Sequence, residues 1–186
     1  MTRYALLVRG INVGGKNKVV MEELRQELTD LGLEKAESYI NSGNVFFTST
    51  DTKSQLIEKL ETFFGTRYPF IQSFSLLSQE DYEAEVENLP AWWNEDLARK
   101  DVLFYTEGLD VAQVIEKVNG LELEDEVVHF GKLGIFWGKF SEETYSKTAY
   151  HKHLLKMPFY RQITIRNAKT FEKIGQMLKN NKGDTQ

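Results

Sequence analysis

The chain has 186 residues, of which 41% are hydrophobic and 27% charged, and these proportions are typical of a globular protein, not a disordered or fibrous one. It has no cysteine, which excludes disulfides, thiolate nucleophiles and zinc-thiolate sites. The formal net charge of −5 repels polyanions, so nucleic-acid binding would need a strongly local basic patch. No apolar run reaches the roughly 18 residues of a membrane span and no secretion signal is present, so we expect a cytoplasmic protein with no membrane partner.

The first 76 residues predict the element order βαββαβ. The continuous apolar run from Tyr4 to Val8 predicts a buried strand, and apolar residues at three- and four-residue spacing predict the helix after it. Two polar turns and one capping box mark the remaining boundaries. We expect strands at residues 4–8, 36–40, 45–48 and 70–76, one helix over 21–31 that Gly32 ends, and a second from the capping box of Thr52 and Gln55 to Gly65.

Residues 78–99 interrupt this order and predict a connector with a short acidic helix and two adjacent tryptophans. Trp92 and Trp93 cannot easily share one buried face, so one is expected to pack between the halves and the other to stay partly exposed. The order βαββαβ then repeats without residue-level identity. We expect strands at 102–105, 126–130, 135–140 and 162–165, helices over 111–118 and from Ser141 onward, and a last helix capped by Asn167.

The predicted fold class is therefore α+β, with two ferredoxin-like (βαββαβ) subdomains in tandem plus a C-terminal helix. We expect the first subdomain at 1–77, the connector at 78–99 and the second subdomain with its C-terminal helix at 100–186, whose last residues, 180–186, should fray. Each half of ~70 residues would have a marginal core alone, so the halves should form one cooperative unit. In a split βαβ unit the sheet order is 4-1-3-2, which places the loop after the first strand beside the hairpin before the third.

Those two loops form the candidate site. Backbone N–H groups near Gly14 and Gly15, with Lys16 and Lys18, predict a nest for an anion. The alternative is that the glycines only permit a tight loop and that the asparagines bond neighbouring backbone. The side chains of the two loops are expected to face one another across a shallow pocket, and Arg166, beside Asn167, is a further candidate for a carboxylate or phosphate. The candidate ligand-binding residues are Arg9, Asn12, Gly14, Gly15, Lys16, Lys18, Asn41, Ser42, Asn44, Arg166 and Asn167.

Other motifs fail on their chemistry. The stretch from Gly10 to Lys16 has P-loop spacing, but Asn17 stands where a Ser or Thr hydroxyl would meet magnesium. His151 and His153 are two residues apart and would point to opposite sides of a helix, so no metal site is expected. Ser42 lacks the strand-to-helix elbow of a serine hydrolase. Neither a catalytic residue nor a cofactor is indicated.

Four stretches resemble the signatures of domain-of-unknown-function family 1697, a family of uncharacterised bacterial proteins. They are residues 7–19, 21–24, 39–45 and 164–167, with Val20 where the family carries proline and Asn41 where glutamine is frequent. The resemblance implies paired ferredoxin-like subdomains and brings no established activity.

The leading prediction is binding of a small anionic or nucleotide-like ligand, or of the phosphate of a larger partner, at the edge from Arg9 to Lys18. Nucleic acid as a partner is not expected from the overall charge. An enzyme acting at the same edge and an interaction module using Trp92 and Trp93 stay open, as do the ligand and the oligomeric state.

Overall fold

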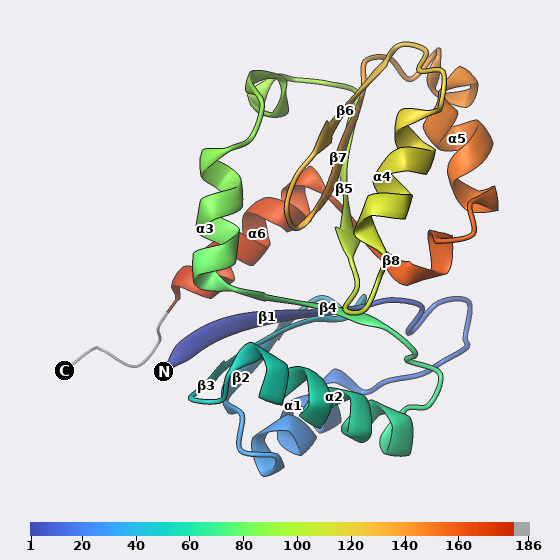
Figure 1. Ribbon diagram of the computed structural model, residues 1–186. Helices are drawn as coiled ribbons and strands as arrows, with labels where there is room; N and C mark the ends of the chain where they lie inside the picture. Colours follow the sequence, from blue (N-terminus) through green and yellow to red (C-terminus); the bar gives the residue numbers. More distant parts are fainter. Residues whose placement is uncertain (181–186) are drawn as a thin grey trace.

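The computed structural model describes residues 1–180, which form two four-stranded antiparallel sheets with helices (Figure 1). The first sheet has the order β2-β3-β1-β4 and the second β6-β7-β5-β8, so the two halves share one arrangement. In each sheet the first and third strands of the half are central, as a split βαβ unit requires. The predicted α+β fold with two similar subdomains is confirmed. The expected fraying concerns residues that, apart from Asn180, lie outside the described range.

In the first half, two expected boundaries shift. The helix begun by the Thr52–Gln55 capping box continues past Gly65, since one helical glycine costs only about 1 kcal/mol and buried Leu60 and Phe64 offset it. The last strand begins at Phe74 instead of Phe70, because the residues after Tyr68 turn first. The elements are β1 (Thr2–Val8), α1 (Met21–Asp30), β2 (Glu34–Tyr39), β3 (Asn44–Ser49), α2 (Lys53–Arg67) and β4 (Phe74–Ser78).

The second half differs from expectation at one helix. Ser141 does not cap a helix, and α5 instead begins after Thr148, whose side chain accepts a hydrogen bond from the backbone N–H of His151 at 3.2 Å. The elements after β4 are α3 (Gln79–Glu87), η1 (Ala91–Asn94), β5 (Arg99–Tyr105), α4 (Val111–Asn119), β6 (Glu126–Phe130), β7 (Gly134–Lys139), η2 (Tyr145–Lys147), α5 (Ala149–His153), η3 (Leu154–Lys156), η4 (Tyr160–Gln162), β8 (Ile163–Asn167) and α6 (Ala168–Lys179).

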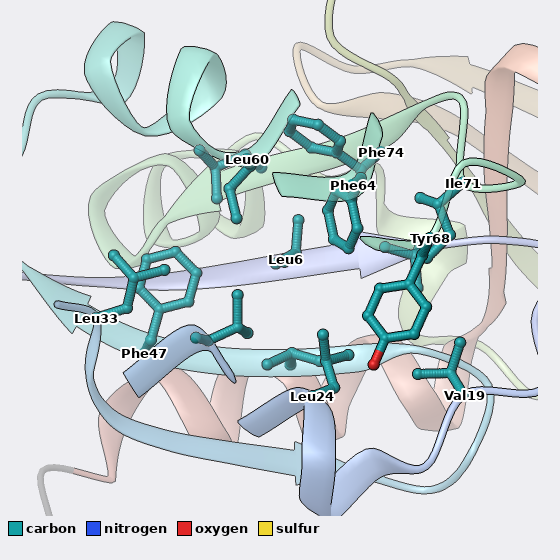
Figure 2. Close-up of a cluster of buried hydrophobic side chains, with 14 of the residues drawn as sticks. Leu6, Val19, Leu24, Leu33, Phe47, Leu60, Phe64, Tyr68, Ile71 and Phe74 are labelled. Atoms are coloured by element: carbon teal, nitrogen blue, oxygen red, sulfur yellow. The ribbon is translucent and has the colours of Figure 1, made fainter. Parts of the chain in front are cut away.

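Both faces of both sheets are covered. Helices α1 and α2 cover the outer face of the first sheet, where Leu24, Leu60 and Phe64 pack on strand residues such as Leu6 and Phe47 (Figure 2). Helices α4 and α5 contribute to the cluster on the outer face of the second sheet. Because no sheet face is open, a nucleic-acid platform on a sheet, as in RNA-binding β-sheet modules, has no place here.

The inner faces of the two sheets share one apolar cluster, and α6 lies between them (Figure 1). The cluster joins three groups of side chains. They are Ala5, Leu7 and Phe46 of the first sheet, Val102, Phe104 and Phe136 of the second, and Phe171, Ile174 and Leu178 of α6. Burial of this apolar surface couples the two halves.

The two tryptophans of the connector divide as predicted. Trp93 is only 7% exposed and packs edge-to-face on Phe136 and Phe171, at ring-centroid distances of 5.0 and 5.7 Å. Trp92 remains partly exposed. The pair thus belongs mainly to the shared core. Among residues 1–180, no helix is both long enough and apolar enough to cross a membrane.

Candidate functional site

Residues 10–18 form a short ordered projection, which we call the finger. Gly14 and Gly15 both have positive φ, 59° and 73°, and the N–H of Lys16 donates to the carbonyl of Val13 at 3.0 Å. Positive φ at both central residues is what a tight two-residue turn of the primed type requires, and glycine adopts it without strain. The tip is exposed, with Val13 at 67%. The finger is therefore a miniature hairpin, not a loop folded over a cavity.

The asparagines of the finger bond to the chain itself. The amide of Asn12 donates to the carbonyls of Val19 and Asn41, at 3.0 and 2.9 Å, and its oxygen accepts from the N–H of Val19 at 2.8 Å. Asn17 donates to the carbonyl of Gly10 at 2.9 Å. The contact of Asn12 with Asn41 joins the finger to residues 41–44, as the strand order predicts. The bonds observed for Asn12 agree with the alternative stated above, that the asparagines only bond neighbouring backbone.

The hairpin at residues 41–44 presents one face to solvent and one to the interior. Asn41 and Ser42 are exposed, whereas Asn44 is fully buried and donates to the carbonyl of Tyr39 and the hydroxyl of Ser42. Gly43 has a φ of 97°, and a Cβ there would collide with the side chain of Val8. Asn44 therefore holds the turn and cannot face a ligand.

Arg166 comes from the second half and is buried, with 8% of its surface exposed. Its Nε donates to Oδ1 of Asn44 at 2.7 Å, and one terminal nitrogen donates to the carbonyl of Val8 at 2.7 Å and more weakly to those of Ser42 and Gly43. Burial lowers the pKa of Arg166 to about 10, so it stays protonated at neutral pH. Arg166 thus clamps the hairpin from the second half, and its predicted contact with a ligand stays a prediction.

Asn167, the neighbour of Arg166, acts as the N-cap of α6. Its side-chain oxygen accepts from the N–H of Thr170 at 2.8 Å. This is the capping role expected from its position between the last strand and the last helix.

Arg9 makes the opposite connection, from the first half to the second. Its guanidinium donates to the carbonyls of Tyr160 and Ile163 and lies over the ring of Tyr160, 5.0 Å from the centroid. Ser73 adds a bond to the carbonyl of Arg161 at 3.5 Å. The finger and residues 160–163 therefore belong to one continuous edge of the molecule, seen on the right in Figure 1.

The shallow pocket predicted between the two loops stays a prediction. Five pockets in residues 1–180 are all lined by residues other than the finger and residues 41–44. They lie between α3 and α6, at the junction of β4 and β5, on α2, beside α4, and under the turn after β6. The Asn12 amide bonds from the finger to the carbonyl of Asn41, and the Arg166 guanidinium bonds to the carbonyls of Val8 and Ser42, so we treat the candidate site as an open edge.

Charge is strongly segregated at this edge. Residues 1–21 and 144–171 contain ten of the 23 Lys and Arg residues and none of the 28 Asp and Glu residues. Within residues 1–180, Arg3 is the only cation of these two segments that forms an ion pair. Lys16, Lys18, Lys152, Lys156 and Arg161 are all exposed. The sequence alone carried this signal, which the net charge hides.

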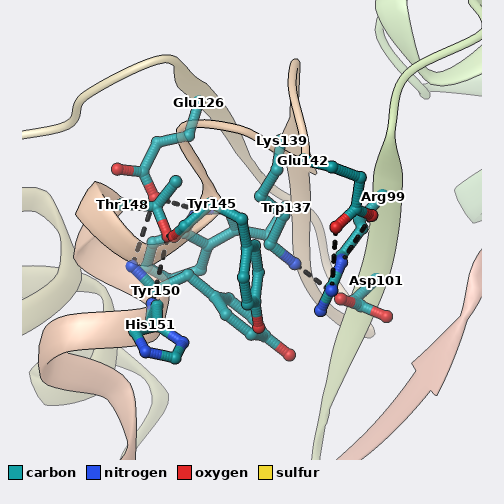
Figure 3. Close-up of polar contacts among 10 residues, drawn as sticks. All are labelled: Arg99, Asp101, Glu126, Trp137, Lys139, Glu142, Tyr145, Thr148, Tyr150 and His151. Atoms are coloured by element: carbon teal, nitrogen blue, oxygen red, sulfur yellow. Dashed lines mark hydrogen bonds and ion pairs between the residues drawn. The ribbon is translucent and has the colours of Figure 1, made fainter.

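A second polar cluster anchors the basic segment 144–171 to the second sheet (Figure 3). The carboxylate of Glu126 accepts from the N–H groups of Ala149 and Tyr150, at 2.7 and 3.2 Å, which fixes where α5 begins. Lys139 is fully buried, pairs with Asp101 at 2.5 Å and lies 3.3 Å from the ring centroid of Tyr150. Burial lowers the pKa of Lys139, and Asp101 partly opposes this. Because these hydrogen bonds and this ion pair join parts of the chain to one another, we assign the cluster a structural role.

Comparison with known proteins identifies a family and a solved structure that this chain resembles. Residues 1–136 match the family described as "Protein of unknown function (DUF1697)". A solved structure described as the conserved bacterial protein SP0830 from Streptococcus pneumoniae is 83% identical, with a TM-score of 0.95, and the match covers 96% of this chain and 99% of that one. No curated protein matches the chain.

Proposed function

The chain belongs to the DUF1697 family, whose description names no function, and we propose from its own site that it binds a phosphate-bearing anion at the basic edge. The basic edge comprises the finger, Arg9, residues 41–42 and residues 152–161. The observation that carries the proposal is a group of exposed cations that have no carboxylate partner within residues 1–180, in a chain of net charge −5. Such a group attracts an anion and lacks an internal one.

The roles proposed for the candidate residues divide by exposure. Lys16 and Lys18 are exposed at the finger and are assigned to direct contact with the anion. The N–H groups of Gly14 and Gly15 lie at the same exposed tip and can add donors. Arg9 is half-buried and offers the part of its guanidinium that the carbonyls of residues 160 and 163 do not occupy.

The remaining candidates are assigned to shaping the edge. The side chains of Asn12, Asn44 and Arg166 are held by bonds within the protein, and Asn167 caps a helix. Exposed Asn41 and Ser42 stay candidate contacts at the rim. We therefore expect variants of the first group to change stability and variants of Lys16 and Lys18 to change affinity.

Isothermal titration with pyrophosphate and with ATP, at fixed ionic strength, tests the proposal. Lys16→Ala/Lys18→Ala should weaken the affinity for the bound probe at least tenfold, which is about 1.4 kcal/mol, while the melting temperature of the free protein stays within error. The matched control is Lys132→Ala/Lys179→Ala, two exposed lysines outside the basic edge. Equal affinity in the edge variant and the control would overturn the assignment of Lys16 and Lys18 to the anion site.

The enzyme alternative stays open. The interaction-module alternative expected one tryptophan buried and the other partly exposed, and it keeps the partly exposed Trp92 as its contact. The cytoplasmic location stays a prediction.

A further inference from the structure

We infer that the anion bound by the basic edge is single-stranded nucleic acid, held along its backbone and stacked on aromatic side chains of residues 144–171. The inference rests on the proposed function, because it names the ligand class of the same edge. It also meets the condition set by the overall charge, since a strongly local basic patch is what the two acid-free segments form.

The shape of the edge favours an extended ligand over a compact one. The exposed cations of the edge line none of the five pockets, although the pocket beside α4 is lined in part by Pro158 and Phe159. The exposed cations instead follow the chain from α5 through η3 and η4, with Lys152, Lys156 and Arg161, and continue into the finger with Lys16 and Lys18. The Arg9 contacts with residues 160 and 163 join the two parts. A linear polyanion can meet such a series of charges, whereas a single phosphate can meet only a few.

Aromatic rings are interleaved with these cations. Tyr160 is partly exposed, and His151 and His153 are exposed, all within the same acid-free segment. One face of Tyr145 is covered by Arg99 and one face of Tyr150 by Lys139, so these two rings are less available. Proteins that bind single strands without sequence preference combine a basic surface with aromatic rings, because every base has a face that stacks. Tyr160 already lies under the Arg9 guanidinium, so a ring and a cation are placed together at the centre of the edge.

A duplex fits this arrangement less well, because its bases are already stacked and cannot use the rings. A platform on a sheet is also excluded, since both sheets are covered on both faces. Acidic residues more than about 8 Å from the edge contribute little repulsion, because charges at that distance are largely screened at physiological salt. The local patch, not the net charge of −5, decides the attraction.

Fluorescence anisotropy of a fluorescein-labelled 15-nucleotide oligo(U) or oligo(dT), titrated at several NaCl concentrations, tests the inference. Binding should weaken with salt, and Lys16→Ala/Lys18→Ala should reduce the slope of log K against log [salt] by about 1.4, at roughly 0.7 for each phosphate contact. Tyr160→Leu should weaken binding about fivefold or more at every salt concentration. Arg161→Ala should also weaken binding. Because Arg161 is exposed, this variant tests the edge even if Tyr160→Leu fails to fold.

The competing results are distinct. If pyrophosphate or ATP binds through Lys16 and Lys18 but neither oligonucleotide does, the inference is overturned and the proposed function stands. If no probe binds, both are overturned. A 15-base-pair duplex or polyphosphate that binds as tightly as the oligonucleotides, with no effect of Tyr160→Leu, would overturn the single-strand assignment in favour of a general polyanion site. The control Lys132→Ala/Lys179→Ala should behave as wild type.

Discussion

Replacing Arg166 by methionine would test whether this side chain holds the two halves together at the basic edge. The substitution keeps an apolar chain of similar length and removes all the donors that reach Val8 and Asn44. The carbonyl of Gly43 would still accept from the N–H of Val8, and the carbonyl of exposed Ser42 could accept from water instead. Two buried acceptors would therefore lose their partner.

The expected cost follows from that count. A buried acceptor without a donor costs about 1–3 kcal/mol, so two cost about 2–6 kcal/mol. Removing a desolvated cation returns part of this, since a buried charge is itself unfavourable. We expect Arg166→Met to lower the free energy of unfolding by about 3 kcal/mol, a large part of the 5–15 kcal/mol that domains typically have. Arg166→Lys should lose about half as much, because one ammonium cannot reproduce the fork of the guanidinium.

Urea unfolding followed by circular dichroism would measure these losses. Arg161→Met, an exposed arginine in the same segment, is the matched control and should stay within about 0.5 kcal/mol of wild type. A double-mutant cycle of Arg166→Lys with Asn44→Ala should give a coupling energy of at least 0.5 kcal/mol. A loss below 1 kcal/mol for Arg166→Met, or strictly additive effects in the cycle, would refute the clamp.

Three further outcomes are expected. Two single-tryptophan variants can be compared, one that retains only Trp92 and one that retains only Trp93, with Trp137 replaced in both. Iodide should quench the fluorescence of Trp92 more strongly than that of Trp93, and equal quenching would contradict their different burial. Burial raises the pKa of Glu85, so its folded form binds a proton more readily than the unfolded chain and stability should rise as pH falls toward 4.5; Glu85→Gln should flatten that slope in urea titrations at several pH values. Lys139→Met should lower the free energy of unfolding in urea by about 3–5 kcal/mol, because it leaves Asp101 without its partner. A double variant that also replaces Asp101 by leucine should recover stability. If it does not, lost packing and not the unpaired charge of Asp101 is responsible.

Local patterns were sufficient for most of the fold. The periodicity around Leu24 and the capping box of Thr52 predicted helices because neighbouring residues alone decide them. The start of α5 was not predictable in this way, since the carboxylate that accepts its first N–H groups belongs to Glu126, more than twenty residues earlier. A helix boundary that depends on hydrogen bonds to a residue far away in the sequence cannot be predicted from the spacing of neighbouring residues.

The candidate site shows the same limit. Asn12 and Arg166 have the donors of an anion site, and the sequence cannot show that carbonyls of neighbouring loops already accept them. The structure shows that Lys16 and Lys18 are exposed and available to a ligand, whereas Asn12 is only partly exposed and Arg166 is buried. The segregation of charge, in contrast, was available in the sequence and was masked by averaging over the whole chain.

The position of α6 between the two sheets has a consequence for synthesis on the ribosome. Ala5, Leu7 and Phe46 emerge early, but the side chains of α6 that cover them, including Phe171 and Ile174, are made much later. At about 5–20 residues per second, the roughly 100 residues between the end of β4 and the end of α6 take about 5–20 s to translate. During that time α6 does not yet cover the inner apolar face of the first sheet. We therefore expect this face to bind chaperones that recognise exposed hydrophobic surface.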